Sequence, residues 1–194
     1  MRIAMLFCLA LSAILIAACG PGNTVRLLPA PPLPAATIPA PNAPSISIVN
    51  FKDERIDPHA IGARRDGTAF TTTGDVAAWV SRALADELAR KGFRVTYATS
   101  ASQARNSNPD FLVTGIVNEI WLREASATEM NTQMRINCTL ANRKGKLWTE
   151  SCNSSQVRTG LPSTSAADNL LLDTLRDMLK PVVDKIVQSV ESRK

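Results

Sequence analysis

Prolines are concentrated in one stretch of this chain, and they limit where a packed core can form. Eight of the 12 prolines lie between residues 20 and 45, in the sequence GPGNTVRLLPAPPLPAATIPAPNAPS. Such a segment favours extended polyproline II backbone and supplies few core-forming side chains. We therefore predict a disordered tether over residues 19–44, with an edge strand around Val25 as the alternative, and a single folded domain over residues 45–194. At ~3.1 Å per residue, the tether would let the domain reach about 80 Å from its attachment point.

The first apolar run is too short to span a membrane, which takes about 20 apolar residues. It covers residues 3–18 after the cation Arg2. A positive start, a short apolar run and small residues at its end are typical of a secretory signal peptide, here residues 1–18. The run ends in Ile-Ala-Ala-Cys, which resembles the lipobox of bacterial lipoproteins. The resemblance implies cleavage before Cys19, a diacylglycerol on its sulfur and a fatty acyl chain, such as palmitate, on the new amino terminus.

An ordinary secretory signal or an uncleaved anchor are the alternatives to a lipobox. If Cys19 is lipidated, its three acyl chains exceed the two that stable anchoring needs. Gly20, rather than aspartate, follows Cys19. By analogy with lipoprotein sorting, this indicates the outer membrane, with the chain on the inner leaflet facing the periplasm.

The charge pattern argues against a nucleic-acid partner and favours no other class of partner. The formal net charge is +5, or +4 once Arg2 is removed with the signal peptide. Such a mild excess is typical of a solvated surface, although it would also favour anionic lipid or cell-wall surfaces. No basic block with interleaved aromatic residues is present, so we predict no nucleic-acid partner.

Two cysteines remain once Cys8 is removed and Cys19 is lipidated: Cys138 and Cys152. They lie on the two arms of a predicted hairpin, in a compartment that would be oxidising. One register of the hairpin places Cys138 opposite Glu150, with Cys152 on the diagonal. A second register, in which the pairing of the two strands is shifted at the turn, places Cys138 directly opposite Cys152. Both registers put the cysteines on one face, so we predict a structural disulfide, with two buried free thiols as the alternative.

Hydrophobic periodicity predicts an α+β fold. Strands are predicted at residues 45–51, 93–99, 110–122, 130–142 and 146–157, and helices at 75–91 and about 165–190. The polar segment between the first strand and the first helix is predicted to be a long loop or an open hairpin. We expect an antiparallel sheet of four to five strands with two main helices packed on one face.

Local signals predict where these elements begin, end and bend. Thr72 with Asp75, and Ser165 with Asp168, approximate capping boxes, and Gly92 and Gly145 are predicted to adopt positive φ. Pro181 is predicted to kink or break the last helix. In the long strand, the alternation places Val117, Glu119 and Trp121 on one face.

The sequence carries no recognisable catalytic or metal-binding motif, and we predict no enzymatic activity, no metal and no cofactor. The only histidine, His59, has no partner at ligand spacing. One loop after the first strand mixes both charges with glycine, in DERIDPHAIGARR. It is a candidate recognition loop for a partner or an anionic ligand. We favour the alternative, a salt-bridged connection that covers a sheet edge. The candidate residues are Asp53, Arg55, Asp57, Ile61, Gly62 and Arg64.

The lipobox and the proline-rich spacer, together with SISIVNFKDERID, VAAWVSRALADELARKGFRV, DFLVTGIVNEIWL and AADNLLLDTLRDML, are similar to the YajG-type family of bacterial outer-membrane lipoproteins. The resemblance implies an envelope lipoprotein and brings no catalytic residues. We expect a non-enzymatic binding or adaptor module with an envelope protein partner. The alternative is an auxiliary lipoprotein of a lipid or solute transport system, which would bind a small apolar ligand or a transporter subunit. An apolar cavity would favour the alternative, and a filled core would favour protein contact.

Overall fold

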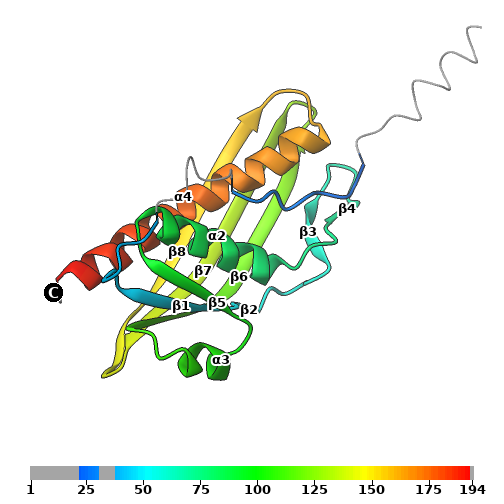
Figure 1. Ribbon diagram of the computed structural model, residues 1–194. Helices are drawn as coiled ribbons and strands as arrows, with labels where there is room; N and C mark the ends of the chain where they lie inside the picture. The colour runs from blue at the N-terminus through cyan, green and yellow to red at the C-terminus, as the bar shows by residue number, and fades with distance from the viewer. Residues whose placement is uncertain (1–21, 31–37, 193–194) are drawn as a thin grey trace, which may run out of the picture.

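A long three-stranded antiparallel ribbon forms the centre of the molecule in the computed structural model, which describes residues 22–30 and 38–192 (Figure 1). In chain order, the elements are β1 (Ser45–Val49), β2 (Lys52–Asp53), β3 (Ala60–Ala63), β4 (Ala69–Thr71), α2 (Val76–Arg90), β5 (Arg94–Ala98), α3 (Ala101–Asn106), β6 (Phe111–Ser126), β7 (Glu129–Asn142), β8 (Gly145–Thr159) and α4 (Thr164–Glu191). β6, β7 and β8 make the ribbon, and shorter strands extend it from β6.

The sheet is mixed and eight-stranded, so the prediction of an antiparallel sheet of four to five strands is wrong in both respects. β7 pairs antiparallel with one edge of β6, while β1, β2 and β3 pair parallel with successive stretches of its other edge. β5 then pairs parallel with β1, and β4 antiparallel with β3. A parallel neighbour requires a crossover connection, and α2 supplies it between β1 and β5. The polar segment predicted to be a long loop or an open hairpin contributes β2 and the antiparallel pair of β3 and β4.

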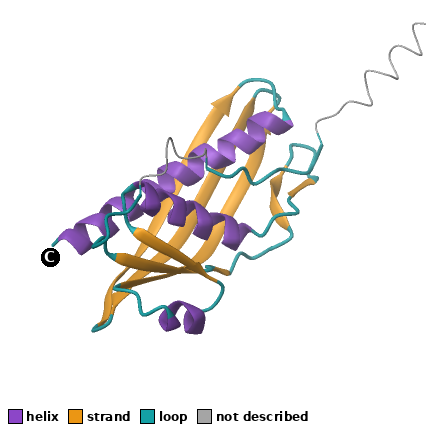
Figure 2. Cartoon of the chain, in the orientation of Figure 1, coloured by secondary structure: helices purple, strands orange, loops and turns teal. Residues whose placement is uncertain are grey.

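α2 and α4 lie over the same face of the sheet, as predicted (Figure 2). Their apolar stripes share one continuous buried cluster with alternate residues of the strands, among them Ile46, Ile48, Val113 and Ile136. The short helix α3 lies by β1 and β5 on the opposite side, where Val49, Ala98 and Ala104 form a small separate cluster. β1 therefore has both faces covered, as its β-branched sequence requires. Within the described residues, no helix is long and apolar enough to cross a membrane.

The helix ends differ in detail from the sequence predictions. Asp75 itself caps α2, because its Oδ1 accepts a hydrogen bond from the backbone N–H of Ala78 at 2.9 Å. Ser163, rather than Ser165, caps α4 and accepts from the N–H of Ala166. Gly92 adopts φ +85° after α2, which confirms the predicted left-handed stop. α4 runs unbroken through Pro181 from Thr164 to Glu191, so the predicted break does not occur.

Part of the predicted tether packs on the domain. The N–H of Thr71 donates to the carbonyl of Asn23 at 2.9 Å, and that of Val25 donates to the carbonyl of Thr71 at 2.8 Å. Val25 is buried, and the indole Nε1 of Trp79 donates to the carbonyl of Leu28 at 2.7 Å. Residues 23–28 are therefore part of the folded body, because Val25 is buried in it and backbone groups of Asn23, Val25 and Leu28 hydrogen-bond to it. Residues 1–21 and 31–37, which include the predicted signal peptide and Cys19, lie outside the described residues.

Candidate functional site

The predicted recognition loop is held together by Arg55. Its guanidinium donates to both carboxylate oxygens of Asp53, with Nη2···Oδ2 at 2.8 Å and Nε···Oδ1 at 2.9 Å, and to the carbonyls of Pro58 and Ala60 at 2.9 Å. Only 5% of the Arg55 side chain is exposed. Burial acts to raise the pKa of Asp53, but the hydrogen bonds and the charge of Arg55 outweigh it and leave the pKa below its ordinary value. Arg55 thus closes its own loop and presents little charge to a ligand.

Asp57 and Gly62 also serve the local backbone. Asp57 Oδ1 accepts from the N–H groups of His59 and Ala60 at 2.9 and 3.2 Å, and the first of these bonds is the main cause of its lowered pKa. A Cβ on Gly62 would lie 1.9 Å from the carbonyl oxygen of Leu122, so only glycine permits the close approach of β3 to β6. These contacts support a structural role for both residues.

Arg64 and Ile61 complete the candidate set without joining a common site. Arg64 pairs with Glu124, with Nε···Oε1 at 3.3 Å, and lies over the Phe70 ring at 5.9 Å. Ile61 is fully buried in the core. The interactions favour the salt-bridged connection over a converging ligand site, since each charged group is used within the fold.

Beside this loop lies a cleft of about 370 Å³, the loop–sheet cleft. It is lined by Arg55, Ile56, Asp57, Asn118, Glu119, Ile120, Trp121 and Arg135. Ile56 is fully exposed at its rim, and Trp121 is 39% exposed. Arg135 and Glu119 form an ion pair across β6 and β7 at 3.5 Å. Two large apolar side chains therefore reach solvent next to a charge pair of both signs.

A β-bulge in β6 creates this arrangement. Val117 faces Ile136 on the buried side, but the pairing then skips Asn118 and places Glu119 opposite Arg135 on the outer side. The predicted common face of Val117, Glu119 and Trp121 is therefore wrong. The extra residue shifts the alternation by one and turns Trp121 away from the core. The spacing of three between the buried Val117 and Ile120 is the sequence signal that could have revealed the bulge.

The bulge also leaves a polar group without a partner at the cleft. The side-chain oxygen Oδ1 of Asn118 is buried and accepts no hydrogen bond from the described residues. A buried acceptor of this kind is costly unless something satisfies it. The sequence alone does not indicate Asn118, Ile56 or Arg135 as site residues, and it places Trp121 only on a face of the long strand. The reason is that the cleft joins a loop to strands distant in sequence.

The rest of the outer face of the ribbon is polar and largely uncharged. Thr139 and Thr149 share a hydrogen bond across β7 and β8, with 2.8 Å between their Oγ1 atoms. The other outward-facing side chains of β7 and β8 include Asn131, Gln133, Asn137, Ser151, Asn153, Ser155 and Val157. Trp121 is thus a large aromatic group at the margin of a hydrophilic surface.

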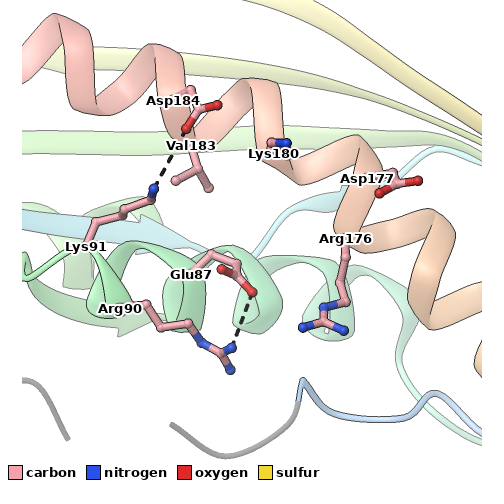
Figure 3. A pocket seen from close by; sticks show the side chains of 8 residues that line it. All are labelled: Glu87, Arg90, Lys91, Arg176, Asp177, Lys180, Val183 and Asp184. Atoms are coloured by element: carbon pink, nitrogen blue, oxygen red, sulfur yellow. Dashed lines mark ion pairs between the residues drawn. The ribbon is translucent and has the colours of Figure 1, made fainter. Parts of the chain in front are cut away.

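A second cleft, of about 260 Å³, lies along the seam between α2 and α4 (Figure 3). Its charged side chains alternate in sign, and ion pairs join Arg90 to Glu87 at 3.7 Å and Lys91 to Asp184 at 3.9 Å. Because cations and carboxylates are interspersed, the seam forms neither a positive nor a negative patch. It is better described as a salt-bridged contact between helices than as a binding site.

The two cysteines are buried free thiols in the structure. Cys138 faces Glu150 and Cys152 faces Ile136, which is the diagonal arrangement of the two registers considered above. Diagonal neighbours lie ~7–8 Å apart, beyond the Cα separation that a disulfide accepts without backbone movement. The predicted disulfide is therefore not present. Burial, with smaller effects from Cys152 and Glu150, raises the pKa of Cys138 to about 12, so its thiol is unreactive at neutral pH.

His59 lies in the exposed loop, where its backbone N–H donates to Asp57. Within residues 22–30 and 38–192, no group of three or more histidine, cysteine or acidic side chains is placed to hold a metal ion.

Comparison with known proteins shows the fold but no family. No family model matches the chain, and no curated protein matches it. Protein XCC0632 from Xanthomonas campestris, of the family DUF330, is similar in structure, with a TM-score of 0.58 and 12% identity over 88% of this chain and 96% of that one. An uncharacterised protein has a TM-score of 0.52 and 8% identity, over 74% and 92% of the two chains.

Lipoprotein GNA1162 from Neisseria meningitidis aligns over 75% of this chain and 99% of its own at 16% identity, but its TM-score of 0.41 supports no inference. At these identities, the two better matches establish a shared fold alone. The resemblance to the YajG-type family remains an expectation from the sequence.

Proposed function

We propose that this chain is a lipoprotein anchored through Cys19 in the inner leaflet of the outer membrane, and that it acts as a non-enzymatic adaptor in the periplasm. Its partner is another envelope protein, which binds at the loop–sheet cleft. The observation that carries the proposal is the pair of exposed apolar side chains, Ile56 and Trp121, at the rim of this cleft. Tryptophan in a recessed site beside charged groups is typical of residues that dominate protein–protein binding energy.

A filled core supports protein contact over ligand carriage. The space between the sheet and helices α2 and α4 is occupied by one continuous cluster of buried side chains. A carrier of small apolar ligands would need a lined cavity there. The unsatisfied oxygen of Asn118 offers an acceptor to a partner donor, which would recover the cost of its burial.

The test places a photo-crosslinking amino acid at Ile56 in intact cells and, as a control, at Lys144 on the exposed hairpin tip. We expect one specific protein adduct at Ile56 that is absent at Lys144. The captured partner, once purified, should bind the Trp121→Ala variant about tenfold or more weakly than wild type. The matched control is Val157→Ala, which removes another exposed apolar side chain from the same sheet face and should leave binding unchanged.

Identical adducts at Ile56 and Lys144, or wild-type affinity in Trp121→Ala, would refute the adaptor proposal. A small apolar molecule as the sole adduct at Ile56 would favour the auxiliary transport lipoprotein instead.

A further inference from the structure

The docked segment 23–28 fixes where the chain joins the domain. Besides the two backbone hydrogen bonds to β4, Arg26 donates to Asp168 from its backbone N–H at 2.8 Å and from Nε at 2.9 Å. The side chain of Asp168 is 1% exposed, and Val25 is also 1% exposed. Peeling this segment off would leave a buried carboxylate without its partner and expose an apolar side chain. The chain is therefore held to the domain from Asn23 onward.

This attachment leaves a very short link to the lipidation site. Four peptide units separate Cys19 from Asn23, and they span at most about 14 Å when fully extended. The headgroup layer on each side of a bilayer is itself roughly 5–8 Å thick. If Cys19 carries the lipid, the surface around Asn23 cannot lift clear of the bilayer by more than about one layer of side chains. The reach of about 80 Å expected from the sequence is thereby excluded for the docked state.

Asn23 contacts the first of three turns that lie toward one end of the molecule, and together we call these turns the proximal end (Figure 1). They are the β3–β4 turn at 64–68, the β6–β7 turn at 127–128 and the β8–α4 loop at 160–163. Arg64 Nη1 donates to Asn23 Oδ1 at 3.0 Å, and the N–H of Gly160 donates to the carbonyl of Thr128 at 2.8 Å. In Figure 1, the hairpin between β7 and β8 and the C-terminus lie at the other end of the molecule.

The chemistry of the proximal end suits a phospholipid surface. Arg65 lies in the β3–β4 turn, and Arg123 lies next to it on β6, opposite Ala63. Both are exposed, and neither has an ion-pair partner among the described residues. Leu161 is 82% exposed in the β8–α4 loop. The exposed Asp66 opposes one of these charges, because its hydrogen bonds with Thr68 lower its pKa and favour the ionised carboxylate. The two arginines and Asp66 together keep one net positive charge. Arginine matches phosphate geometry, and an anionic membrane surface attracts cations that lie close to it.

We infer that the proximal end lies directly on the phospholipid surface that holds the Cys19 lipid. Arg65 and Arg123 contact headgroup phosphates, Leu161 enters the interface, and the hairpin tip points into the periplasm. This inference rests on the proposed lipidation of Cys19. It assigns to the membrane a second contact, made by the domain itself.

The test uses the full lipidated chain in vesicles of phosphatidylethanolamine and phosphatidylglycerol. A photo-crosslinking amino acid replaces Leu161 in one sample and Lys144 in the other, and mass spectrometry measures phospholipid adducts. We expect a several-fold higher yield at Leu161. A twenty-residue glycine–serine spacer between Gly22 and Asn23, with a root-mean-square span of about 25 Å, should lower the Leu161 yield towards that of Lys144. The double variant Arg65→Glu, Arg123→Glu should lower it as well, whereas Lys144→Glu should not.

Equal yields at Leu161 and Lys144, or an unchanged yield with the spacer, would overturn the inference. The same spectra report the mass of the Cys19 peptide. A lipidated Cys19 with equal yields contradicts only the membrane contact of the domain, while an unmodified Cys19 contradicts the proposed anchoring as well.

Discussion

Asp168 shows how much a single residue can decide in this fold. Its side chain is 1% exposed, and it binds Arg26, 142 positions away in the sequence. From the sequence it is the second half of a capping box. In the structure Ser163 caps α4, so Asp168 is free to hold the N-terminal segment against the first turns of that helix.

Replacing Asp168 should therefore destabilise the domain. We expect Asp168→Asn to lower the free energy of unfolding by about 1–3 kcal/mol, because the amide cannot accept both hydrogen bonds from Arg26. Urea denaturation followed by circular dichroism measures this change in the free energy of unfolding. Asp86→Asn, at an exposed position on α2, should stay within ~0.5 kcal/mol of wild type, and an equal loss in both variants would argue against the buried pair.

The cysteines give a second prediction at the scale of residues. Because Cys138 faces Glu150 rather than Cys152, we expect both thiols to be alkylated when protein purified without reductant is unfolded. Burial also favours the neutral thiol of Cys138, whose pKa rises from 9.0 to about 12. The unfolded chain then loses its proton first, so stability should fall as pH rises through this window.

Intact mass after alkylation, with and without reductant, distinguishes the two states. Alkylation that requires reductant would show that the hairpin shifts to form the disulfide predicted from the sequence. In that case the contribution of the Cys138 thiol to the fall in stability above pH 9 should appear only after reduction, since the oxidised pair has no thiol to titrate.

At the scale of elements, β8 depends on α4. Within the described part of the chain β8 pairs only with β7, and its inner side chains instead contact α4. Arg158 pairs with Asp173 at 3.0 Å, Trp148 Nε1 donates to Ser189 Oγ at 2.9 Å, and Glu150 and Gln156 contact Lys185 and Asp177. These polar contacts between β8 and α4 run along most of the strand. The helix therefore stabilises β8 in the way that a further paired strand would.

Trp148→Ala should loosen β8 more than β7. The variant loses ring packing, the bond to Ser189 and a cation–π contact with Lys185 at 5.1 Å. Since the ring is only partly buried, we expect a loss of about 2 kcal/mol, below the range for fully buried aromatics. Hydrogen exchange should rise in β8 while β6 and β7 stay protected. Uniform acceleration across the sheet would contradict a helix-supported edge.

At the scale of the whole molecule, the docked N-terminal segment sets the position of the domain relative to its anchor. Val25→Asp should release it, because an ionised side chain cannot occupy the buried site of Val25. Trypsin then reports the change, since Arg26 is a cleavage site held against Asp168 in wild type. We expect faster cleavage after Arg26 in the variant.

Cleavage after Arg143, on the exposed hairpin tip, serves as the internal control for this experiment. Its rate should be the same in wild type and Val25→Asp if the variant releases only the segment. Equal rates after Arg26 in the two proteins would contradict docking, and faster cleavage at both sites would indicate that the whole domain has unfolded.

The sequence by itself determined the local structure of this protein. The stripe of α2, the stop at Gly92, the positive φ of Gly145 and the strands at 45–49, 94–98 and 129–142 follow from short-range periodicity and turn chemistry. These features depend on residues within a few positions of one another, so one sequence is enough to predict them.

The pairing of the strands and the placement of the N-terminal segment were decided only by the tertiary structure. The parallel pairing of β1, β2 and β3 with β6, the docking of residues 23–28 and the turning of Trp121 to solvent all depend on contacts between distant segments. A bulge of one residue reverses which side chains face the core, and a single buried carboxylate makes part of a proline-rich tether into part of the domain. Such choices are set by the free energy of packing across the whole chain, which local propensity does not contain.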